Sequence, residues 1–241
     1  MPTHRVRLKK QQELAESTLG FHFEKPPGFT YQAGQFVNLT LLDPPETDAK
    51  GNTRSFTLSS APHEDDLMVA TRMRDTAFKR ALGHLAPGAE VKLGGPFGNF
   101  ILSREASRAT VFVAGGIGVT PFRSMALDAT HRKLARPLFL FYSNRRPEDA
   151  AFLDELTQAT QCNPSFHLIP LMTQAEKSDR VWSGLTGRLN EGEVKRWLKR
   201  LEGPEYYIAG PPALVAAMQQ MLKAGGVREE DIRSDEFAGY E

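Results

Sequence analysis

The spacing of apolar residues changes once along the chain, close to residue 105, and this change limits the folds that the chain can adopt. Before it, short alternating apolar runs at residues 5–8, 35–39, 55–58 and 90–93 are separated by Gly and Pro, which is typical of an antiparallel sheet or barrel. One helical pattern, at residues 77–85, interrupts these runs. After the change, strands alternate with helices, which predicts a doubly wound parallel sheet.

The second part of the chain alternates strand patterns with helix patterns. The strands are expected at residues 110–114, 138–142, 166–171 and 206–209, with a further short strand near Ile232. The helices are expected from Pro121 onward and at residues 149–158, 191–201 and 212–224. The polar stretch 103–108 has no core of its own, so the join is placed near Ala106, between a domain of residues 1–105 and one of residues 106–241. The polar loop at residues 43–53 is interpreted as a surface excursion.

The length of 241 residues allows either one large domain or two ordinary ones. The charge balance limits which classes of binding partner are expected. Lys and Arg number 30 against 29 for Asp and Glu, and the net charge of +1 gives no general attraction for nucleic acid or an anionic membrane. No apolar run approaches bilayer length, and no apolar segment follows the basic start. We therefore expect a soluble, cytoplasmic protein without membrane insertion.

Cysteine and metal chemistry have little support in these residues. Cys162 is the only cysteine in the sequence, which excludes a disulfide, a cysteine-ligated iron–sulfur cluster or a cysteine-built zinc site within it. The 6 histidines are scattered without a metal-binding spacing, so no metal is expected.

A glycine-rich loop, Gly115-Gly116-Ile117-Gly118-Val119-Thr120-Pro121, directly follows an apolar strand and leads into a helix. Glycines without Cβ atoms let the backbone approach a pyrophosphate closely, and the free N–H groups of a helix start favour negative charge. The loop is neither a Walker loop nor a G-x-G-x-x-G fingerprint, and by itself it is equally consistent with a tight turn that binds nothing. Its position between strand and helix favours nucleotide binding.

Several motifs, in this order, resemble those of the ferredoxin-NADP reductase superfamily. Arg54-Ser55-Phe56-Thr57 resembles its Arg-x-Tyr-Ser flavin motif, residues 115–121 resemble its GGxGxTP nucleotide motif, and Ala209-Gly210-Pro211 resembles its Cys-Gly-Pro signature. Residues 72–79, 95–98 and 236–240 also follow the family order. The resemblance spans nearly the whole chain. It implies an N-terminal antiparallel flavin-binding β-barrel followed by an NAD(P)-binding α/β domain.

For the flavin, the resemblance implies that Arg54 contacts the phosphates, Phe56 packs on the ring system, and Thr57 lies near N5 with a catalytic role. It further implies that Thr76 contacts the phosphates, and we expect Ser55 and Arg72 among the cofactor-binding residues. Phe56 replaces the usual Tyr and Thr57 the usual Ser. The alternative is an ordinary barrel strand with Phe56 inside and Arg54 in a surface ion pair. FAD is the expected cofactor, with FMN the less favoured choice.

For the nicotinamide coenzyme, the residues expected to bind are gathered from the ends of several strands. They are Gly115, Gly116, Gly118, Thr120, Pro121, Ser143, Arg145, Gly210 and Pro211. Arg145 and Arg146 could accept a 2′-phosphate, which favours NADPH, but two solvated loop arginines explain the pair equally well. The resemblance places another phosphate-binding arginine at residues 172–174, where this sequence has none, and this leaves NADH open. Ala209 stands where many relatives have a cysteine.

The C-terminal Phe237 matches the aromatic residue that in relatives covers the flavin face where the nicotinamide stacks, and we expect it to be a flavin lid with a catalytic role. The alternative is a tail phenylalanine packed into the core. The expected function is transfer of hydride from NAD(P)H to flavin N5, followed by electron transport to an acceptor such as ferredoxin, flavodoxin or an oxygenase component. The alternative function is that of a non-catalytic electron-transfer subunit of a larger complex.

Overall fold

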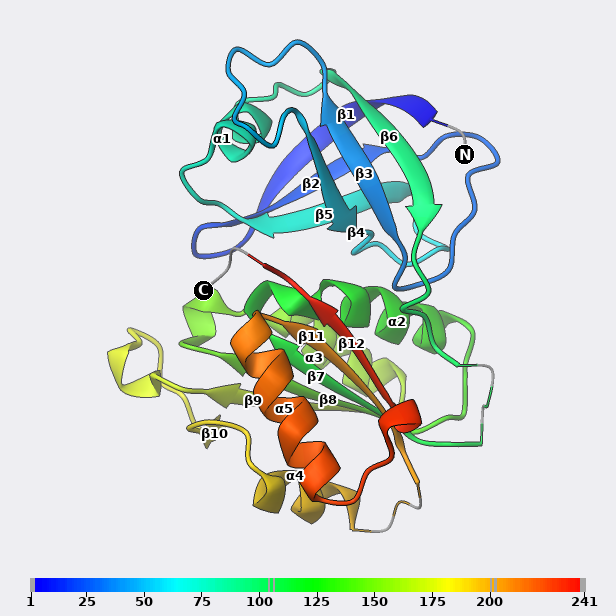
Figure 1. Ribbon diagram of the computed structural model, residues 1–241, viewed down its shortest axis with the longest axis vertical. Helices are drawn as coiled ribbons and strands as arrows, with labels where there is room; N and C mark the ends of the chain where they lie inside the picture. Colours follow the sequence, from blue (N-terminus) through cyan, green and yellow to red (C-terminus); the bar gives the residue numbers. More distant parts are fainter. Residues whose placement is uncertain (1–2, 104, 106, 200, 202, 239–241) are drawn as a thin grey trace.

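A computed structural model of the chain describes residues 3–103, 105, 107–199, 201 and 203–238. The first six strands form one antiparallel sheet of order β4-β3-β6-β1-β2-β5 (Figure 1). Their bounds are β1 (Thr3–Ala15), β2 (Thr18–Glu24), β3 (Phe36–Leu41), β4 (Thr53–Thr57), β5 (Asp66–Arg72) and β6 (Glu90–Phe97). A bridge between Leu58 and Val69 joins the two edges of the sheet and closes it into a barrel.

Strict alternation places one side of β3 in the barrel core. Val37, Leu39 and Leu41 of β3 are each at most 1% exposed, while the residues between them are partly exposed. The helix α1 (Ala77–Gly83) packs Phe78 and Leu82 onto this core, close to where a helix was predicted. This packing explains why short alternating runs suffice to specify the barrel.

Two barrel strands, β2 and β5, were not predicted as strands. In β5, residues 67–71 are all buried, so the sequence does not alternate. Leu67 and Val69 face the barrel core, whereas Met68 and Ala70 pack against the second domain. A strand covered on both faces lacks the polar face that alternation requires.

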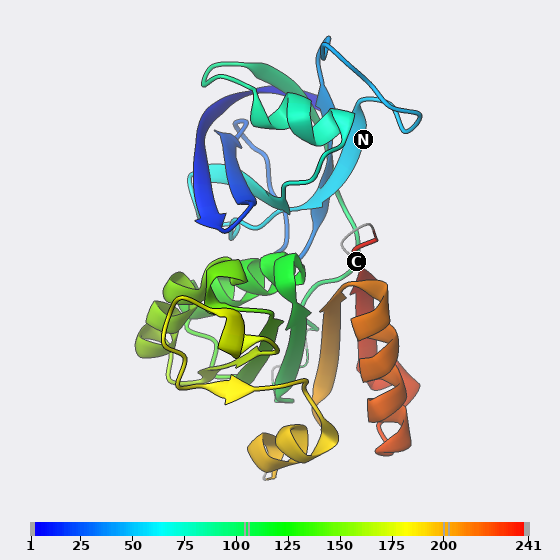
Figure 2. The same cartoon turned by 90° about the vertical axis from the view of Figure 1, so that its left-hand side faces the viewer.

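The second domain is a six-stranded parallel sheet of order β10-β9-β8-β7-β11-β12 with helices on both faces (Figures 1 and 2). Its strands are β7 (Thr110–Gly115), β8 (Leu138–Asn144), β9 (Phe166–Met172), β10 (Leu185–Thr186), β11 (Glu205–Gly210) and β12 (Ile232–Glu236). Its helices are α2 (Thr120–His131), α3 (Leu153–Cys162), α4 (Glu191–Leu198) and α5 (Pro212–Ala224). The predicted doubly wound fold class, including the strand near Ile232, is confirmed.

The helices divide between the faces of this sheet. Residues of α2 and α3 share a core with Phe112 and Tyr207, whereas residues of α4 and α5 share another with Val113 and Ile208. The strand order reverses between β7 and β11, and ligands of doubly wound sheets bind at the carboxyl end of such a switch point. The carboxyl ends of these parallel strands face the barrel (Figure 1).

Two predicted helix boundaries are wrong. The helix expected at residues 149–158 begins at Leu153, because Pro147–Asp149 form a 3₁₀ turn and Phe152 has a left-handed backbone with φ of 62°. The helix expected at residues 191–201 ends at Leu198. Its predicted end includes Arg200, which lies outside the described residues, as does Ala106, where the domain join was placed.

The helix α2 joins the two domains through Arg123, which is only 4% exposed. Its guanidinium donates to Glu64 and to the Ser59 carbonyl in the barrel, and to Glu155 of α3. The neighbouring Ser124 hydroxyl donates to the Ser60 carbonyl at 2.6 Å. Because these partners come from both domains, they fix how the barrel sits on the sheet. Within the described part of the chain, no helix has the length and apolar character needed to cross a membrane.

Candidate functional site

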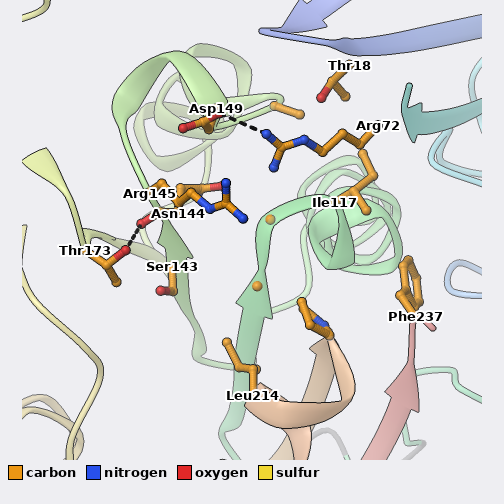
Figure 3. A pocket seen from close by; sticks show the side chains of 14 residues that line it. Thr18, Arg72, Ile117, Ser143, Asn144, Arg145, Asp149, Thr173, Leu214 and Phe237 are labelled. Carbon is orange, nitrogen blue, oxygen red and sulfur yellow. Dashed lines mark hydrogen bonds and ion pairs between the residues drawn. The ribbon is translucent and has the colours of Figure 1, made fainter. Parts of the chain in front are cut away.

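Two cavities lie between the barrel and the carboxyl edge of the parallel sheet, and both are lined by Ile117 and Phe237. The first, which we call the β7 pocket, has a volume of about 180 Å³ and is centred on the loop after β7 (Figure 3). The second, the barrel pocket, has a volume of about 310 Å³. Its lining residues are Phe36, Ser55, Phe56, Thr57, Ala70, Ile117, Thr120, Asp235, Glu236, Phe237 and Ala238.

The glycines of the turns after β7 and β11 have different physical roles, and of these only Gly115 and Gly116 line the β7 pocket. Gly116 has φ of +51°, and an ideal Cβ there would meet nothing within 4 Å. A Cβ on Gly118, in contrast, would lie 2.3 Å from the Ala209 carbonyl oxygen. A Cβ on Gly210 would lie 3.1 Å from the Gly115 backbone. Gly118 and Gly210 therefore let the turns after β7 and β11 touch, whereas Gly116 leaves open space for a ligand.

Thr120 and Pro121 begin α2. The Thr120 side chain is 1% exposed, and its hydroxyl donates to the Ile117 carbonyl at 3.1 Å, which holds the loop in place. Pro121 lies in the first turn, where its missing N–H needs no partner, and it lines neither pocket. Thr120 lines the barrel pocket and not the β7 pocket. The hydrogen bond expected from Thr120 to the nicotinamide coenzyme therefore stays a prediction.

The ends of the neighbouring strands complete the β7 pocket. Ser143, Asn144 and Arg145 at the end of β8 line it, as do Thr173 after β9 and Pro211 after β11. The sequence had indicated Ser143, Arg145 and Pro211, but not Asn144 or Thr173.

The predicted arginine pair after β8 is divided by the structure. Arg145 lines the β7 pocket, whereas the Arg146 guanidinium pairs with Asp149 and with Glu16 of the barrel. Arg146 is therefore already bound to two carboxylates, and Arg145 is the member of the pair placed to meet a phosphate.

Arg72 reaches the β7 pocket from the barrel. Its guanidinium lies 3.5 Å from the Asp149 carboxylate, whose side chain is 6% exposed (Figure 3). Asp149 is five residues beyond β8, so no acidic residue follows the strand directly, and only the turn at Pro147–Asp149 brings it into the pocket. Two guanidinium groups, of Arg72 and Arg145, and one carboxylate line the pocket, which leaves it net positive and suited to an anionic ligand.

The barrel pocket combines aromatic and hydroxyl groups. Phe56 is 8% exposed and Thr57 is 9% exposed, and no hydrogen bond of the Thr57 hydroxyl is found within the described residues. The Ser55 hydroxyl donates to Asn38 at 2.7 Å. Asp235 also lines this pocket, and burial raises the pKa of its carboxyl. This lining fits a flat aromatic ring system with polar edge atoms.

Arg54 and Thr76 line neither pocket. The Arg54 Nη2 donates to both carboxylate oxygens of Asp48 in loop 43–53, at 2.7 and 2.9 Å, and the guanidinium lies 4.9 Å from the Phe78 ring centroid. The Thr76 hydroxyl caps α1 by accepting from the Lys79 N–H at 3.3 Å. Arg54 thus occupies the ion pair that the sequence left as an alternative, and phosphate contacts of Arg54 and Thr76 stay predictions.

Phe237 directly follows β12. Its N–H donates to the Gly210 carbonyl at 2.9 Å, which extends the β11–β12 pairing by one residue. The side chain is partly buried and lines both pockets. The role of Phe237 as a lid stays a prediction, while Gly239 and Tyr240 lie outside the described residues.

Sequence comparison matches residues 112–220 to the oxidoreductase NAD-binding domain. The chain is 28% identical over 228 residues to the reductase component of phenol 2-monooxygenase from Pseudomonas sp. (strain CF600), covering 93% of this chain and 63% of the relative. It is 26% identical over 230 residues to the phenol hydroxylase P5 protein from Acinetobacter pittii (strain PHEA-2), covering 94% of this chain and 63% of the relative. The chain thus spans less than two thirds of the length of these relatives.

Solved structures share the whole fold. The ferredoxin reductase in carbazole 1,9a-dioxygenase has a TM-score of 0.83 at 22% identity, covering 98% of this chain and 69% of that one. A ferredoxin NADP+ reductase from Neisseria gonorrhoeae, solved with bound FAD and NADP, has a TM-score of 0.78 at 20% identity, covering 98% of this chain and 99% of that one. Both likenesses concern the arrangement of the barrel and the parallel sheet.

Proposed function

Because the chain belongs to the ferredoxin-NADP reductase superfamily, we propose that it is an NAD(P)H-dependent flavin oxidoreductase that passes electrons from the coenzyme to a separate acceptor. The observation that carries this proposal is the pair of cavities that share Phe237. One cavity is lined by glycine backbone and guanidinium groups, and the other by aromatic rings and hydroxyls. This pairing suits a dinucleotide beside a flavin.

FAD is the flavin that we propose for the barrel pocket, in line with the FAD named for the Neisseria gonorrhoeae structure. Phe56 provides an apolar face for the ring system, and the Thr57 hydroxyl provides a group that can donate or accept at a ring nitrogen. When bound, the flavin supplies a two-electron acceptor that can release electrons singly. For the phosphates we propose Arg54 and Thr76, which requires that the Arg54 guanidinium exchange Asp48 for a phosphate oxygen.

The coenzyme belongs in the β7 pocket. The open side of Gly116 leaves room for a pyrophosphate, and Arg72 and Arg145 balance its charge. The nicotinamide end then reaches Phe237, where the β7 pocket meets the lining of the barrel pocket. The residues of the chain hold and orient both partners, and Phe237 is displaced when the nicotinamide stacks.

For the acceptor, we propose a small redox protein or an oxygenase component. The support comes from the named role of the Pseudomonas relative as the reductase component of a monooxygenase. The alternative of a non-catalytic electron-transfer subunit receives no support from the β7 pocket, whose glycine turn is open to a ligand.

An anaerobic titration of the purified protein with NADH and with NADPH tests the proposal. We expect the protein to purify with bound flavin and the visible flavin absorption to bleach on addition of at least one coenzyme. Protein without flavin that also fails to bind added FAD would refute the proposal. Flavin that neither coenzyme reduces would refute it as well.

A further inference from the structure

Loop 43–53, which joins β3 to β4, carries two carboxylates that are bound by arginines of the barrel. The Glu46 carboxylate accepts from the Nε and Nη2 of Arg80 in α1, at 2.6 and 2.5 Å. The Asp48 carboxylate accepts from the Nη2 of Arg54 in β4, at 2.7 and 2.9 Å. The loop is therefore held against the barrel at two points, one on α1 and one on β4.

The same loop also encloses the rest of the Arg54 guanidinium. The Nη1 of Arg54 donates to three backbone carbonyls of this segment, at 3.0, 2.9 and 2.8 Å, which belong to Lys50, Gly51 and Thr53. The terminal nitrogens of a guanidinium carry four N–H donors, and one carboxylate and three carbonyls are enough acceptors for all of them. Loop 43–53 therefore acts as a bound anion would act on Arg54.

Two aromatic rings connect Arg54 to the barrel pocket. The guanidinium lies 4.9 Å from the Phe78 ring centroid, and the centroids of Phe78 and Phe56 are 5.9 Å apart. Phe56 lines the barrel pocket. Residues two apart on a strand share a face, so Arg54 and Phe56 point to the same side of β4. A flavin ring at Phe56 can therefore extend its phosphate-bearing chain toward Arg54.

A carboxylate and a phosphate are alternative acceptors for the same guanidinium nitrogens, so Asp48 and a phosphate compete for Arg54. Asp48 and Arg54 are only 6 residues apart along the chain. A group tethered so closely acts at a high effective concentration, of the order of millimolar. We propose that Asp48 is an internal competitor of the flavin phosphate, and that flavin binding displaces Asp48 from Arg54 while Glu46 keeps the loop attached to Arg80.

The identity of the ligand rests on the proposed function, whereas the ease of the exchange follows from the exposure of the pair. The side chains of Arg54 and Asp48 are 23% and 33% exposed. Ion pairs with this much contact with water are weak and are screened by salt. A flavin phosphate arrives together with a ring that packs on Phe56, so it gains more on binding than the Asp48 carboxylate loses.

The test compares riboflavin, FMN and FAD, which share one ring system but differ in their phosphates. Their binding to the full chain, freed of its own flavin, is measured by calorimetry without any redox step. Asp48→Asn keeps the size of the side chain but removes its charge. This variant should bind FMN and FAD about three- to fivefold more tightly, because an exposed ion pair no longer has to be broken. Its affinity for riboflavin, which has no phosphate, should be unchanged.

Asp43 provides the matched control. It lies in the same loop and is exposed, and its carboxylate forms no ion pair within the part of the chain that the structure describes. Asp43→Asn removes the same charge from the loop and should leave the affinity for all three flavins unchanged. Arg54→Gln should weaken FAD binding, and adding Asp48→Asn to Arg54→Gln should bring no gain, because the competition acts through Arg54.

Unchanged or weaker FAD binding in Asp48→Asn would overturn the competition, since Asp48 would then be neutral or would orient Arg54 for the phosphate. An equal gain for riboflavin, an equal gain in Asp43→Asn, or a gain that persists without Arg54 would also overturn it. In each of these cases flavin still binds, so the proposed function stands. If neither the native protein nor Asp48→Asn binds any of the three flavins, the proposed function fails and the competition fails with it.

Discussion

Single glycines at the carboxyl ends of the parallel strands divide into those that let backbone segments touch and those that border open space. Gly118 and Gly210 belong to the first kind, since added Cβ atoms would meet backbone at 2.3 and 3.1 Å. Gly116 belongs to the second, since it combines a left-handed φ of +51° with open space. The motif alone does not distinguish them, because all three are the same residue type.

Substitutions of these glycines should separate binding from stability. Gly116→Val should cost about 1–2 kcal/mol of stability through its left-handed backbone and should block reduction by NAD(P)H, while flavin stays bound. Gly118→Ala should cost about 3 kcal/mol or more, because backbone atoms have to move. Urea denaturation and anaerobic titration measure the two effects. Unchanged coenzyme reduction in Gly116→Val would show that the loop is only a turn.

The Asp235 carboxyl is a second example in which the surroundings of one side chain determine its behaviour. Burial raises its pKa, so the folded protein disfavours its charged form. Stability is therefore gained as the pH falls through the raised, folded-state pKa, and it is reduced above that pH. Asp235→Asn should be more stable than the native protein at pH 7, and the difference should shrink as the solution is acidified. Equal denaturation midpoints at every pH would contradict the assignment.

At the scale of elements, the helices and strands that could be predicted are those whose own residues show a pattern typical of that element. The helix α5 begins at Pro212 and ends at Ala224 as predicted, because a proline start and a continuous apolar face mark it. The strand β5 was missed because it is buried on both faces, which removes the alternation. The start of α3 was misplaced because Asp149, which looks like a helix start, pairs with Arg146 in a separate turn.

The candidate site, too, could be predicted only where its residues belong to a local sequence motif. The glycine loop, Ser143 and Arg145 are visible in a motif, whereas the place of Thr173 in the β7 pocket depends on the pairing of β9 with β8. The Arg72–Asp149 contact joins residues from different domains, and the Arg54–Asp48 pair depends on the path of loop 43–53. Such properties arise from tertiary packing, so no local pattern reports them.

Phe237 directly follows β12, and its substitution tests whether this aromatic side chain can be displaced. Phe237→Ala keeps the backbone N–H that donates to Gly210, so β12 should remain paired and the fold intact. An aromatic stack contributes about 0.5–1.5 kcal/mol beyond burial, which a nicotinamide ring can replace. The variant should expose the flavin, strengthen the nicotinamide charge-transfer band and alter coenzyme preference. Loss of folding with an unchanged flavin spectrum in the remaining native protein would instead identify Phe237 as a core residue.

At the scale of the whole molecule, both pockets exist only while the barrel keeps its place on the sheet. The buried Arg123 guanidinium holds that place through Glu64 of the barrel and Glu155 of α3. Breaking a fully buried pair costs about 3–5 kcal/mol, but these carboxylates are 32% and 40% exposed and regain water when the arginine is lost. We therefore expect Arg123→Met to cost roughly 1–3 kcal/mol.

The pH dependence of this junction follows from Glu64. Burial opposes its charge, but the Arg123 guanidinium outweighs that effect and holds the pKa of the Glu64 carboxyl below its usual range. A lowered folded-state pKa gives stability that is fully present above the unfolded pKa and is lost as the pH falls through the folded one. Glu64→Gln should therefore have a lower free energy of unfolding than the native protein at pH 7, and this difference should narrow in acid. Glu176 is exposed, so Glu176→Gln serves as the control and should match the native protein across the same pH range. Urea midpoints across the acidic range measure this, and a Glu64→Gln deficit that persists undiminished in acid would show that the carboxylate charge does not hold the domains together.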